Sequence, residues 1–513
     1  MKVPSSYKKY FLLALSLSFF IVTVTFQSCK RKPAEIAKML YKKIPNKVFE
    51  DLYDDDFAVV FKKVLAEEKG RMTYPQWISD YYDSIGYKPV LFMADIQDGS
   101  FNNLTDYYDK STEHGFDPKM FQSRQIKELL AKFKSTTEIQ TPDEAYRDIA
   151  RLEILTANSL INYSNDLQYG IISPKRIYSR YFMNTKRPDS ASISQVLKVK
   201  NLGHYLDSIQ PTDPQYIALQ KAYLTNTAIG GLSPEESKRV LLVNMERLRW
   251  KNKPTENKYV IVNIPDYHLD VMDSGKSVLN MKVCVGQGRN MDNSKTLLHF
   301  DDTDRVDKPN PHQTPILNSV IHSVQVNPIW NIPESIANKE IIVQAADDPY
   351  YLSNKNINVY KDDKLVDDPE DIDWNTVDKS EYSFKQQPGE DNSLGKIKFL
   401  FDNRSNVYLH DTPAKAAFYK AMRAVSHGCV RLGNPQGLAL NLFGQTSWQY
   451  AVIDSDMTKA KPDPTTIDLP KKTPVYITYV TCWADTNGVL QYRPDVYEMD
   501  IVLYAHLMDK IGN

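Results

Sequence analysis

The sequence predicts an α+β multidomain protein in which a mainly helical N-terminal scaffold precedes a β-rich domain. Apolar residues recur at helical spacing over residues 72–254, whereas β-branched and alternating runs dominate residues 255–505. The chain has 513 residues, of which 42% are hydrophobic and 11% aromatic. That length and composition allow several buried cores and exclude a chain that is disordered throughout.

The N-terminus has the layout of an export signal. Three lysines and then an uncharged, mostly apolar run over residues 10–26 precede Ser28 and Cys29. A small residue before such a cysteine resembles a bacterial lipoprotein cleavage site, which predicts a signal peptide over residues 1–28 and a lipid on Cys29. An uncleaved membrane anchor is the alternative. Both predict a periplasmic, membrane-anchored chain in a Gram-negative-type envelope, with a tether and short helices over residues 29–71.

Two helix starts in the scaffold region carry the same capping pattern. Thr141 and Ser233 each precede a proline and, three positions after the hydroxyl residue, a glutamate. A hydroxyl N-cap, a proline at the first helical position and an acid in the first turn are typical of helix starts. We expect the second helix to end near Trp250. No group of reactive residues stands out, so residues 72–254 are predicted to be a scaffold.

Strand-like runs follow one another in the β-rich domain, which we place at residues 255–505, before a short tail at 506–513. These runs are 259–264, 268–272, 278–285, 319–326, 397–401, 406–410 and 475–480. A polar, Asp-rich stretch interrupts them at residues 334–395. A loop of that length inside a compact domain is usually a functional lid or else disordered.

Charge and motif content exclude several classes of function. The net charge of -1 gives no electrostatic case for binding nucleic acid. Gly286-Gln287-Gly288 follows a strand but lacks the third glycine and the helix of a nucleotide-binding loop. The sequence contains no CxxC and no HExxH, so it predicts no zinc site. We expect neither a metal nor a cofactor.

Cys429 has the surroundings of a reactive thiol. His427, Gly428 and Arg431 flank it, and positive neighbours lower a thiol pKa toward the nucleophilic thiolate. A second histidine, His410, ends a strand-like run upstream. A cysteine with a base and an orienting group is typical of acyl transfer. From these residues alone, a purely structural role for Cys429 is equally compatible with the sequence.

Cys284 and Cys482 lie in a different sequence context from Cys429. Cys284 alternates within an apolar strand, and Cys482 stands beside a tryptophan at a strand end. Both are predicted to be buried structural thiols, or a pair. If Cys29 is lipid-modified, three thiols remain in an oxidising compartment, and an odd number leaves one free thiol to explain.

His410, followed after 15 residues by Ser426-His427-Gly428-Cys429-Val430-Arg431, resembles the signature of the L,D-transpeptidases with a YkuD-type catalytic domain. Segments 313–315 and 327–333 also resemble that family. Segments 244–250, 386–395 and 408–413 resemble its large YcbB-like branch. The resemblance is strong from about residue 240 to 505 and weak over 72–240. It implies an L,D-transpeptidase catalytic domain behind a helical scaffold, with a substrate cap at 334–395. It includes no clear peptidoglycan-binding module.

The resemblance implies a cysteine-dependent L,D-transpeptidase of peptidoglycan biosynthesis, and hence a role in cell-wall organisation and cell shape. Cys429 is the expected nucleophile: it attacks a tetrapeptide stem, releases D-Ala and forms a thioester. The acyl group then passes to the amine of another stem, which forms a 3–3 cross-link and frees the thiol. His410 is the expected base, oriented by the backbone carbonyl of Asp411. His427 is the competing base.

Supporting residues follow from the same resemblance. Amides near Gly428 and Cys429, together with the Tyr408 hydroxyl, are expected to bind the oxyanion. Ser426 and Arg431 are expected to hold the turn or to bind a substrate carboxylate.

The expected partners are peptidoglycan stem peptides, the membrane through the N-terminal lipid or anchor, and carbapenem-type covalent inhibitors. Trp330 either lines the substrate groove or belongs to a core.

Two other functions are compatible with the sequence. Water as the acceptor would give a carboxypeptidase or endopeptidase, and a silent site would leave a non-catalytic wall-binding scaffold.

Overall fold

The computed structural model describes residues 31–459 and 462–512. The predicted signal segment, with Cys29, lies outside the described residues. Within the described part, no helix is long and apolar enough to cross a membrane. Contacts divide the chain into two compact units. The described parts of the first unit are 31–110, 118–164 and 189–208, and those of the second are 111–117, 165–188, 209–459 and 462–512.

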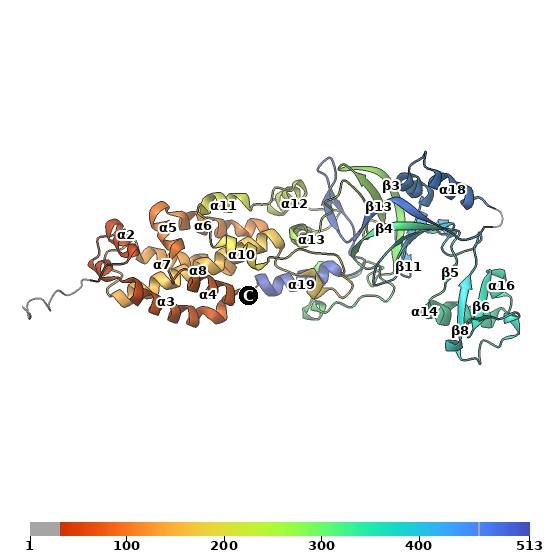
Figure 1. Cartoon of the computed structure of the whole chain (residues 1–513), viewed down its shortest axis with the longest axis horizontal. Helices are drawn as coiled ribbons and strands as arrows, with labels where there is room; N and C mark the ends of the chain where they lie inside the picture. Colours follow the sequence, from red (N-terminus) through yellow and green to blue (C-terminus); the bar gives the residue numbers. More distant parts are fainter. Residues whose placement is uncertain (1–30, 460–461, 513) are drawn as a thin grey trace, which may run out of the picture. The chain divides into compact units, whose positions relative to one another are not determined.

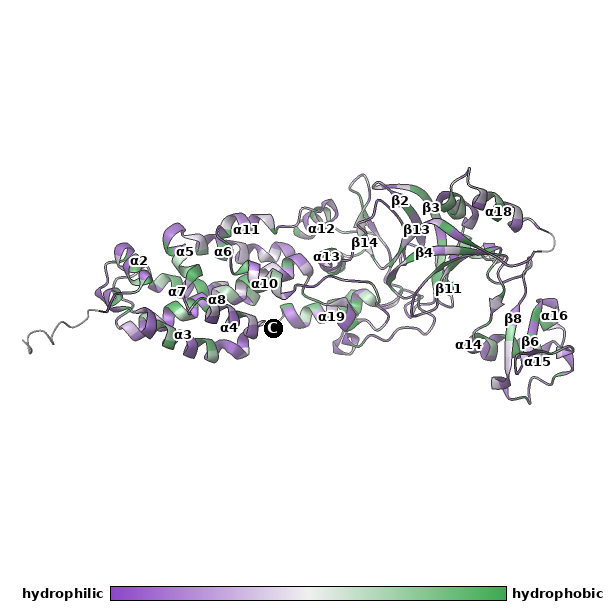
Figure 2. Cartoon of the chain, in the orientation of Figure 1, coloured by the Kyte–Doolittle hydropathy of each residue, from purple (hydrophilic) through white to green (hydrophobic). Residues whose placement is uncertain are grey.

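The first unit is helical (Figure 1). Its main helices are α2 (Glu35–Lys43), α3 (Asp54–Glu68), α4 (Pro75–Ser84), α5 (Val90–Asp98), α6 (Ser100–Asp109), α7 (Ser123–Lys132), most of α8 (Pro142–Tyr169), α10 (Ser190–Val196) and α11 (Leu202–Ser208). Helix α8 begins where the capping pattern predicts, and the Glu144 amide donates to Thr141 Oγ1 at 3.2 Å. Most of these helices mix hydrophobic and hydrophilic residues, as expected for helices buried on one side (Figure 2). Helix α8 is instead buried nearly all round over residues 152–161.

The second unit is built on a nine-stranded sheet in the order β11-β3-β12-β10-β9-β4-β13-β1-β2. Its strands are β1 (Lys258–Asn263), β2 (His268–Asp273), β3 (Lys276–Gly286), β4 (Leu317–Val326), β9 (Ile397–Phe401), β10 (Leu409–His410), β11 (Ala424–Ser426), β12 (Val430–Leu432) and β13 (Thr465–Thr478). Strand β2 also pairs with β3, which closes the sheet on itself. The predicted fold class, a helical N-terminal region before a β-rich domain, is confirmed.

The longer helices of the same unit include α12 (Pro214–Leu224), α13 (Pro234–Arg249), α17 (Pro435–Phe443), α18 (Trp448–Met457) and α19 (Met499–Ile511). Helix α13 begins at the predicted cap, where Ser233 accepts from the Glu236 amide. Its buried residues share one hydrophobic core with the strands. The structure therefore groups α12 and α13 with the sheet, although the sequence places them in the scaffold, because their apolar faces pack on strands far along the chain.

The inserted stretch is neither a loop nor disordered, and this corrects one expectation. Strands β5 (Trp330–Asn331), β8 (Tyr382–Gln386), β6 (Ile357–Lys361) and β7 (Lys364–Leu365) form a four-stranded sheet in that order. Four short helical segments belong to the same region: α14 (Glu334–Ile336), the π-helix η7 (Ala337–Ile341), α15 (Ile342–Asp347) and α16 (Tyr351–Asn354).

This inserted region, which we call the cap, has a hydrophobic core of its own. Val359, Trp374 and Phe384 are almost fully buried in that core. The acidic residues that make the segment look like a loop lie mainly at exposed turns between these elements. A few well-spaced apolar residues therefore fold a segment whose average composition is polar.

Candidate active site

One face of the central sheet gathers the chemically reactive residues. Leu409 of β10 pairs with Val430 of β12, and both are fully buried in the core. Because side chains alternate along a strand, their neighbours Tyr408, His410, Cys429 and Arg431 lie on the opposite face. His410 also pairs with Lys398 on β9, and Arg431 with Cys284 on β3. The sheet thus carries a row of Cys284, Arg431, His410 and Lys398 across four strands.

His410 is held in one orientation by its own chain. Its Nδ1 lies 2.5 Å from the carbonyl oxygen of Asp411, as the resemblance implies, so Nδ1 carries the proton and donates. The unprotonated nitrogen is then Nε2. Burial, reinforced by the positive charge of Arg431, lowers the pKa of His410 to about 3. The imidazole is therefore neutral at neutral pH, which is the form that can accept a proton.

Cys429 is a half-buried thiol directly before β12. Burial raises its pKa to about 11, against hydrogen bonds from the backbone and side chain of Tyr408 and the charges of Arg431 and Lys398. The sequence predicted a lowered thiol pKa, and this is wrong because desolvation outweighs the positive neighbours. The thiol consequently keeps its proton until a base removes it. Cys284, Cys429 and Cys482 are all free thiols, so the alternative of a pair between Cys284 and Cys482 is not realised.

The turn before Cys429 is braced by two hydroxyl groups. Ser426 Oγ donates to the Cys429 carbonyl at 2.6 Å and accepts from the Gly428 amide at 3.2 Å. Thr314 Oγ1 donates to the Gly428 carbonyl at 2.8 Å. Gly428 has a φ of 122°, which side chains rarely allow. The expected oxyanion role of the Gly428 amide is not available in this conformation, because Ser426 already accepts from that amide.

Thr314 belongs to a buried network that extends behind the turn. Its Oγ1 accepts from the Gly286 amide at 2.8 Å. Tyr497 donates its hydroxyl to the Gly286 carbonyl at 2.7 Å and accepts from the Thr314 amide at 3.2 Å. This network joins the turn to the end of β3.

His427 points to the cap. Its Nε2 lies 2.6 Å from Glu340 Oε1 on η7, and its ring centroid lies 4.4 Å from that of His312. Both Glu340 and His427 keep solvent access, with side chains 50% and 30% exposed. The two candidate bases therefore differ in setting: His410 is fixed within the sheet, and His427 contacts the inserted cap.

Two other predicted residues have clear positions. The Asp411 carboxylate accepts from the Lys396 amide at 2.9 Å and pairs with Lys415 at 2.5 Å, so it secures the strand end that carries His410. Trp330 lies on β5, is half-buried and packs against the core of the cap. This favours the core interpretation of Trp330 over the groove interpretation.

The sequence did not single out three residues near the turn: Lys398, His312 and Glu340. Thr314 was noted only as part of segment 313–315. Strand alternation contained a signal for Lys398, because Ile397 and Phe399 on either side are fully buried. Glu340 had no such signal, since it reaches His427 from 87 positions away. In the part of the chain that the structure describes, no cluster of three or more His, Cys, Asp or Glu could hold a metal ion.

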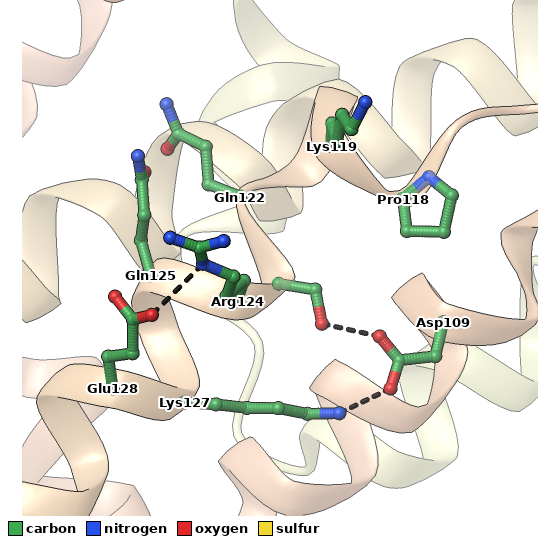
Figure 3. A pocket seen from close by; sticks show the side chains of 9 residues that line it. Asp109, Pro118, Lys119, Gln122, Arg124, Gln125, Lys127 and Glu128 are labelled. Atoms are coloured by element: carbon green, nitrogen blue, oxygen red, sulfur yellow. Dashed lines mark hydrogen bonds and ion pairs between the residues drawn. The ribbon is translucent and has the colours of Figure 1, made fainter.

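A separate open pocket of about 670 Å³ lies on the helical unit (Figure 3). Asp109, Arg124, Lys127 and Glu128 are among its lining residues. Four of its charged side chains are paired, since Arg124 bonds Glu128 and Lys127 bonds Asp109. None of the candidate catalytic residues lines it.

Two known families match separate parts of the chain, one in the β-rich region and one in the helical region. Residues 257–477, which include both His410 and Cys429, match the L,D-transpeptidase catalytic domain, YkuD. Residues 76–222 match the scaffold domain. An L,D-transpeptidase catalytic domain is thus combined with a scaffold domain, as in YcbB-like proteins.

One relative is a Haemophilus influenzae protein named "Putative L,D-transpeptidase". It is 28% identical over 330 residues, which is 63% of this chain and 61% of the relative. The chain therefore aligns with less than two thirds of that relative's length.

Proposed function

We propose that this protein is a cysteine-dependent L,D-transpeptidase that acts on peptidoglycan tetrapeptide stems, releases D-Ala and forms 3–3 cross-links. The observation that carries the proposal is the sheet face of the YkuD domain. There the Cys429 thiol shares its surroundings with a neutral His410 whose Nδ1 is bound to the Asp411 carbonyl. A thiol, a neutral imidazole and an orienting acceptor are the parts that nucleophilic acyl transfer needs.

In the first half-reaction, Nε2 of His410 takes the thiol proton and the Cys429 sulfur attacks the carbonyl of the third stem residue. A tetrahedral oxyanion forms. The C–N bond to D-Ala then breaks, the imidazolium returns its proton to the leaving nitrogen, and a thioester remains. Because burial disfavours the imidazolium, the proton is passed on promptly rather than stored.

In the second half-reaction, the amine of another stem attacks the thioester. His410 accepts a proton from that nitrogen, the new amide bond forms and the C–S bond breaks. The proton on His410 then returns to the sulfur, which restores the thiol. The cap next to the catalytic turn restricts water, the competing acceptor, so that aminolysis prevails.

Two donors remain for the oxyanion, the Cys429 amide and the Tyr408 hydroxyl. The hydroxyl already hydrogen-bonds to the Cys429 thiol, so it lies beside the atom that attacks. One preorganised donor of this kind contributes about 3 kcal/mol to transition-state stabilisation. Ser426 holds the turn that positions these groups.

The test is incubation with disaccharide-tetrapeptides, followed by product analysis. We expect free D-Ala and cross-linked dimers with the wild-type protein and neither with Cys429→Ala. Cys482→Ala is the matched control, because that thiol is also buried but lies outside the site. Turnover by Cys429→Ala would refute the nucleophile. Shortened stems without dimers would show that water is the acceptor and that the protein is a carboxypeptidase.

The N-terminal sequence supports a second proposal, that Cys29 is lipid-modified and tethers the enzyme to a membrane facing the periplasm. Metabolic labelling with palmitate tests it. Label on the wild-type chain and none on Cys29→Ser is the expected result. Equal label on both chains, or none on either, would refute lipidation.

A further inference from the structure

Lys398 is a cation on the reactive face of the sheet. Its register places it opposite His410, on the neighbouring strand, with Ile397 and Phe399 turned into the core. Its Nζ lies 5.4 Å from the ring centroid of Tyr408, the residue whose hydroxyl bonds the Cys429 thiol. The ammonium therefore stands over the aromatic ring next to the nucleophile.

Within the described residues, this ammonium has no carboxylate partner. Among residues 31–459 and 462–512, no acidic side chain forms an ion pair with Lys398 or with Arg431, the second cation of the row. The nearby Asp411 carboxylate is bound to Lys415 and to the Lys396 amide. Half-burial lowers the pKa of Lys398, and only the charge of Cys429 opposes that shift.

Such a site has an excess of positive charge that an incoming anion can neutralise. A half-buried ammonium loses hydration, and it is stabilised when an anion replaces the lost water. The resting thiol cannot do so, because it is protonated. The anion must therefore arrive with the substrate.

We propose that Lys398 binds the terminal carboxylate of the donor stem's leaving residue and thereby selects stems that end in a free carboxylate one residue after the attacked carbonyl. This inference rests on the proposed function, which supplies such a donor. The carboxylate of the leaving residue lies only a few bonds from the carbonyl that the sulfur attacks, so an ammonium beside the sulfur can reach it. Departure of that residue frees Lys398 before the acceptor arrives.

The test compares two donors, a tetrapeptide stem with a free terminal carboxylate and the same stem with a terminal carboxamide. Release of D-alanine or D-alaninamide is measured for wild type, Lys398→Met and Lys398→Arg. Lys396→Met is the matched control, since that lysine lies two positions away but pairs with Glu390 at 2.6 Å. Alkylation of Cys429 by iodoacetamide is followed in parallel to report on the thiol itself.

We expect wild type to prefer the carboxylate donor about 10- to 100-fold in kcat/KM, as for a charge-assisted hydrogen bond. Lys398→Met should lose that preference, because the carboxylate donor slows far more than the carboxamide donor. Loss of a positive charge near Cys429 should slow the carboxamide rate and the alkylation rate by the same, smaller factor. Lys398→Arg should keep part of the preference, and Lys396→Met all of it.

Other outcomes overturn the inference in distinguishable ways. Equal slowing of both donors and of alkylation in Lys398→Met would mean that Lys398 acts on the thiol and not on the substrate. A wild-type protein that cross-links stems but does not discriminate between the donors would refute this inference alone. A wild type that is alkylated normally yet releases nothing from either donor would refute the proposed function and this inference with it.

Discussion

The two histidines near the thiol differ in burial and in the part of the chain that holds the ring. His410 is buried in the central sheet, and the carbonyl of the very next residue fixes its ring. His427 is part of a turn, keeps solvent access and contacts Glu340 from the cap. The first geometry is set by local backbone, so it persists as long as the sheet does. The second depends on where a separately folded region lies. The secondary-structure element that holds a histidine is therefore a better guide to its role as a base than its distance from the cysteine in the sequence.

Replacing each histidine is the strongest test of this comparison. His410→Ala should slow acylation of Cys429 by about 10²- to 10⁴-fold, the usual contribution of a general base. His427→Ala should retain most of the rate, because the turn is braced by hydroxyl groups and not by the imidazole. Acylation is measured by intact mass after mixing with a carbapenem. An inactive His427→Ala beside an active His410→Ala would reverse the assignment.

The pH dependence of thiol alkylation tests the same difference without substrate. The pKa of Cys429 is raised to about 11 and that of His410 is lowered to about 3, so a neutral thiol and a neutral imidazole coexist between these values. The thiolate fraction should therefore increase about tenfold for each pH unit between pH 6 and 9. The measurement is the rate of iodoacetamide modification. A plateau beginning near pH 6 would show a thiolate–imidazolium pair instead.

Thr314→Val removes the hydroxyl that joins the turn to β3. The Gly286 amide and the Gly428 carbonyl then lose a buried partner, and each unsatisfied group of this kind costs about 1–3 kcal/mol. We expect a lower free energy of unfolding and acylation about tenfold slower. Thr466→Val, on an exposed position of β13, should change neither. Unchanged denaturant melts for Thr314→Val would show that this hydrogen-bond network does not stabilise the turn.

The contact between cap and turn should give the smallest effect. Glu340→Gln weakens the partly exposed contact between Glu340 and His427, and surface contacts of this kind contribute about 0.2–1 kcal/mol. We expect up to about fivefold faster amide exchange in η7 and little change in the fold. Glu381→Gln is matched, because Glu381 also lies in the cap and pairs with Lys361 at 2.7 Å. Equal exchange in both variants would mean that Glu340 does not hold the cap.

The sequence predicted local features well because they depend on neighbours in the chain. The caps at Thr141 and Ser233 and strand β9 follow from adjacent residues. The contact of His410 with the Asp411 carbonyl was expected only from the family resemblance. Features that depend on packing were missed. Burial, and not the nearby charges, sets the pKa of Cys429.

The remaining misses have the same origin. The Gly428 amide is taken by a serine that lies only two positions away, but in a geometry that spacing alone does not reveal. The cap folds around a few apolar residues within a polar segment, so its average composition concealed its core. Glu340 reaches the turn only once that cap is folded.

The way the cap enters the sheet has a consequence for modularity. Strands β4 and β9 pair antiparallel up to Val326 and Ile397, so the whole cap occupies the place of a hairpin turn. Its two ends stand one strand spacing apart, and the entropic cost of closing a longer loop grows only slowly with its length. A two-residue turn such as Asn-Gly can therefore replace the cap without changing the strand register. The sheet that carries His410 and Cys429 can therefore keep its strand pairing while the inserted cap changes.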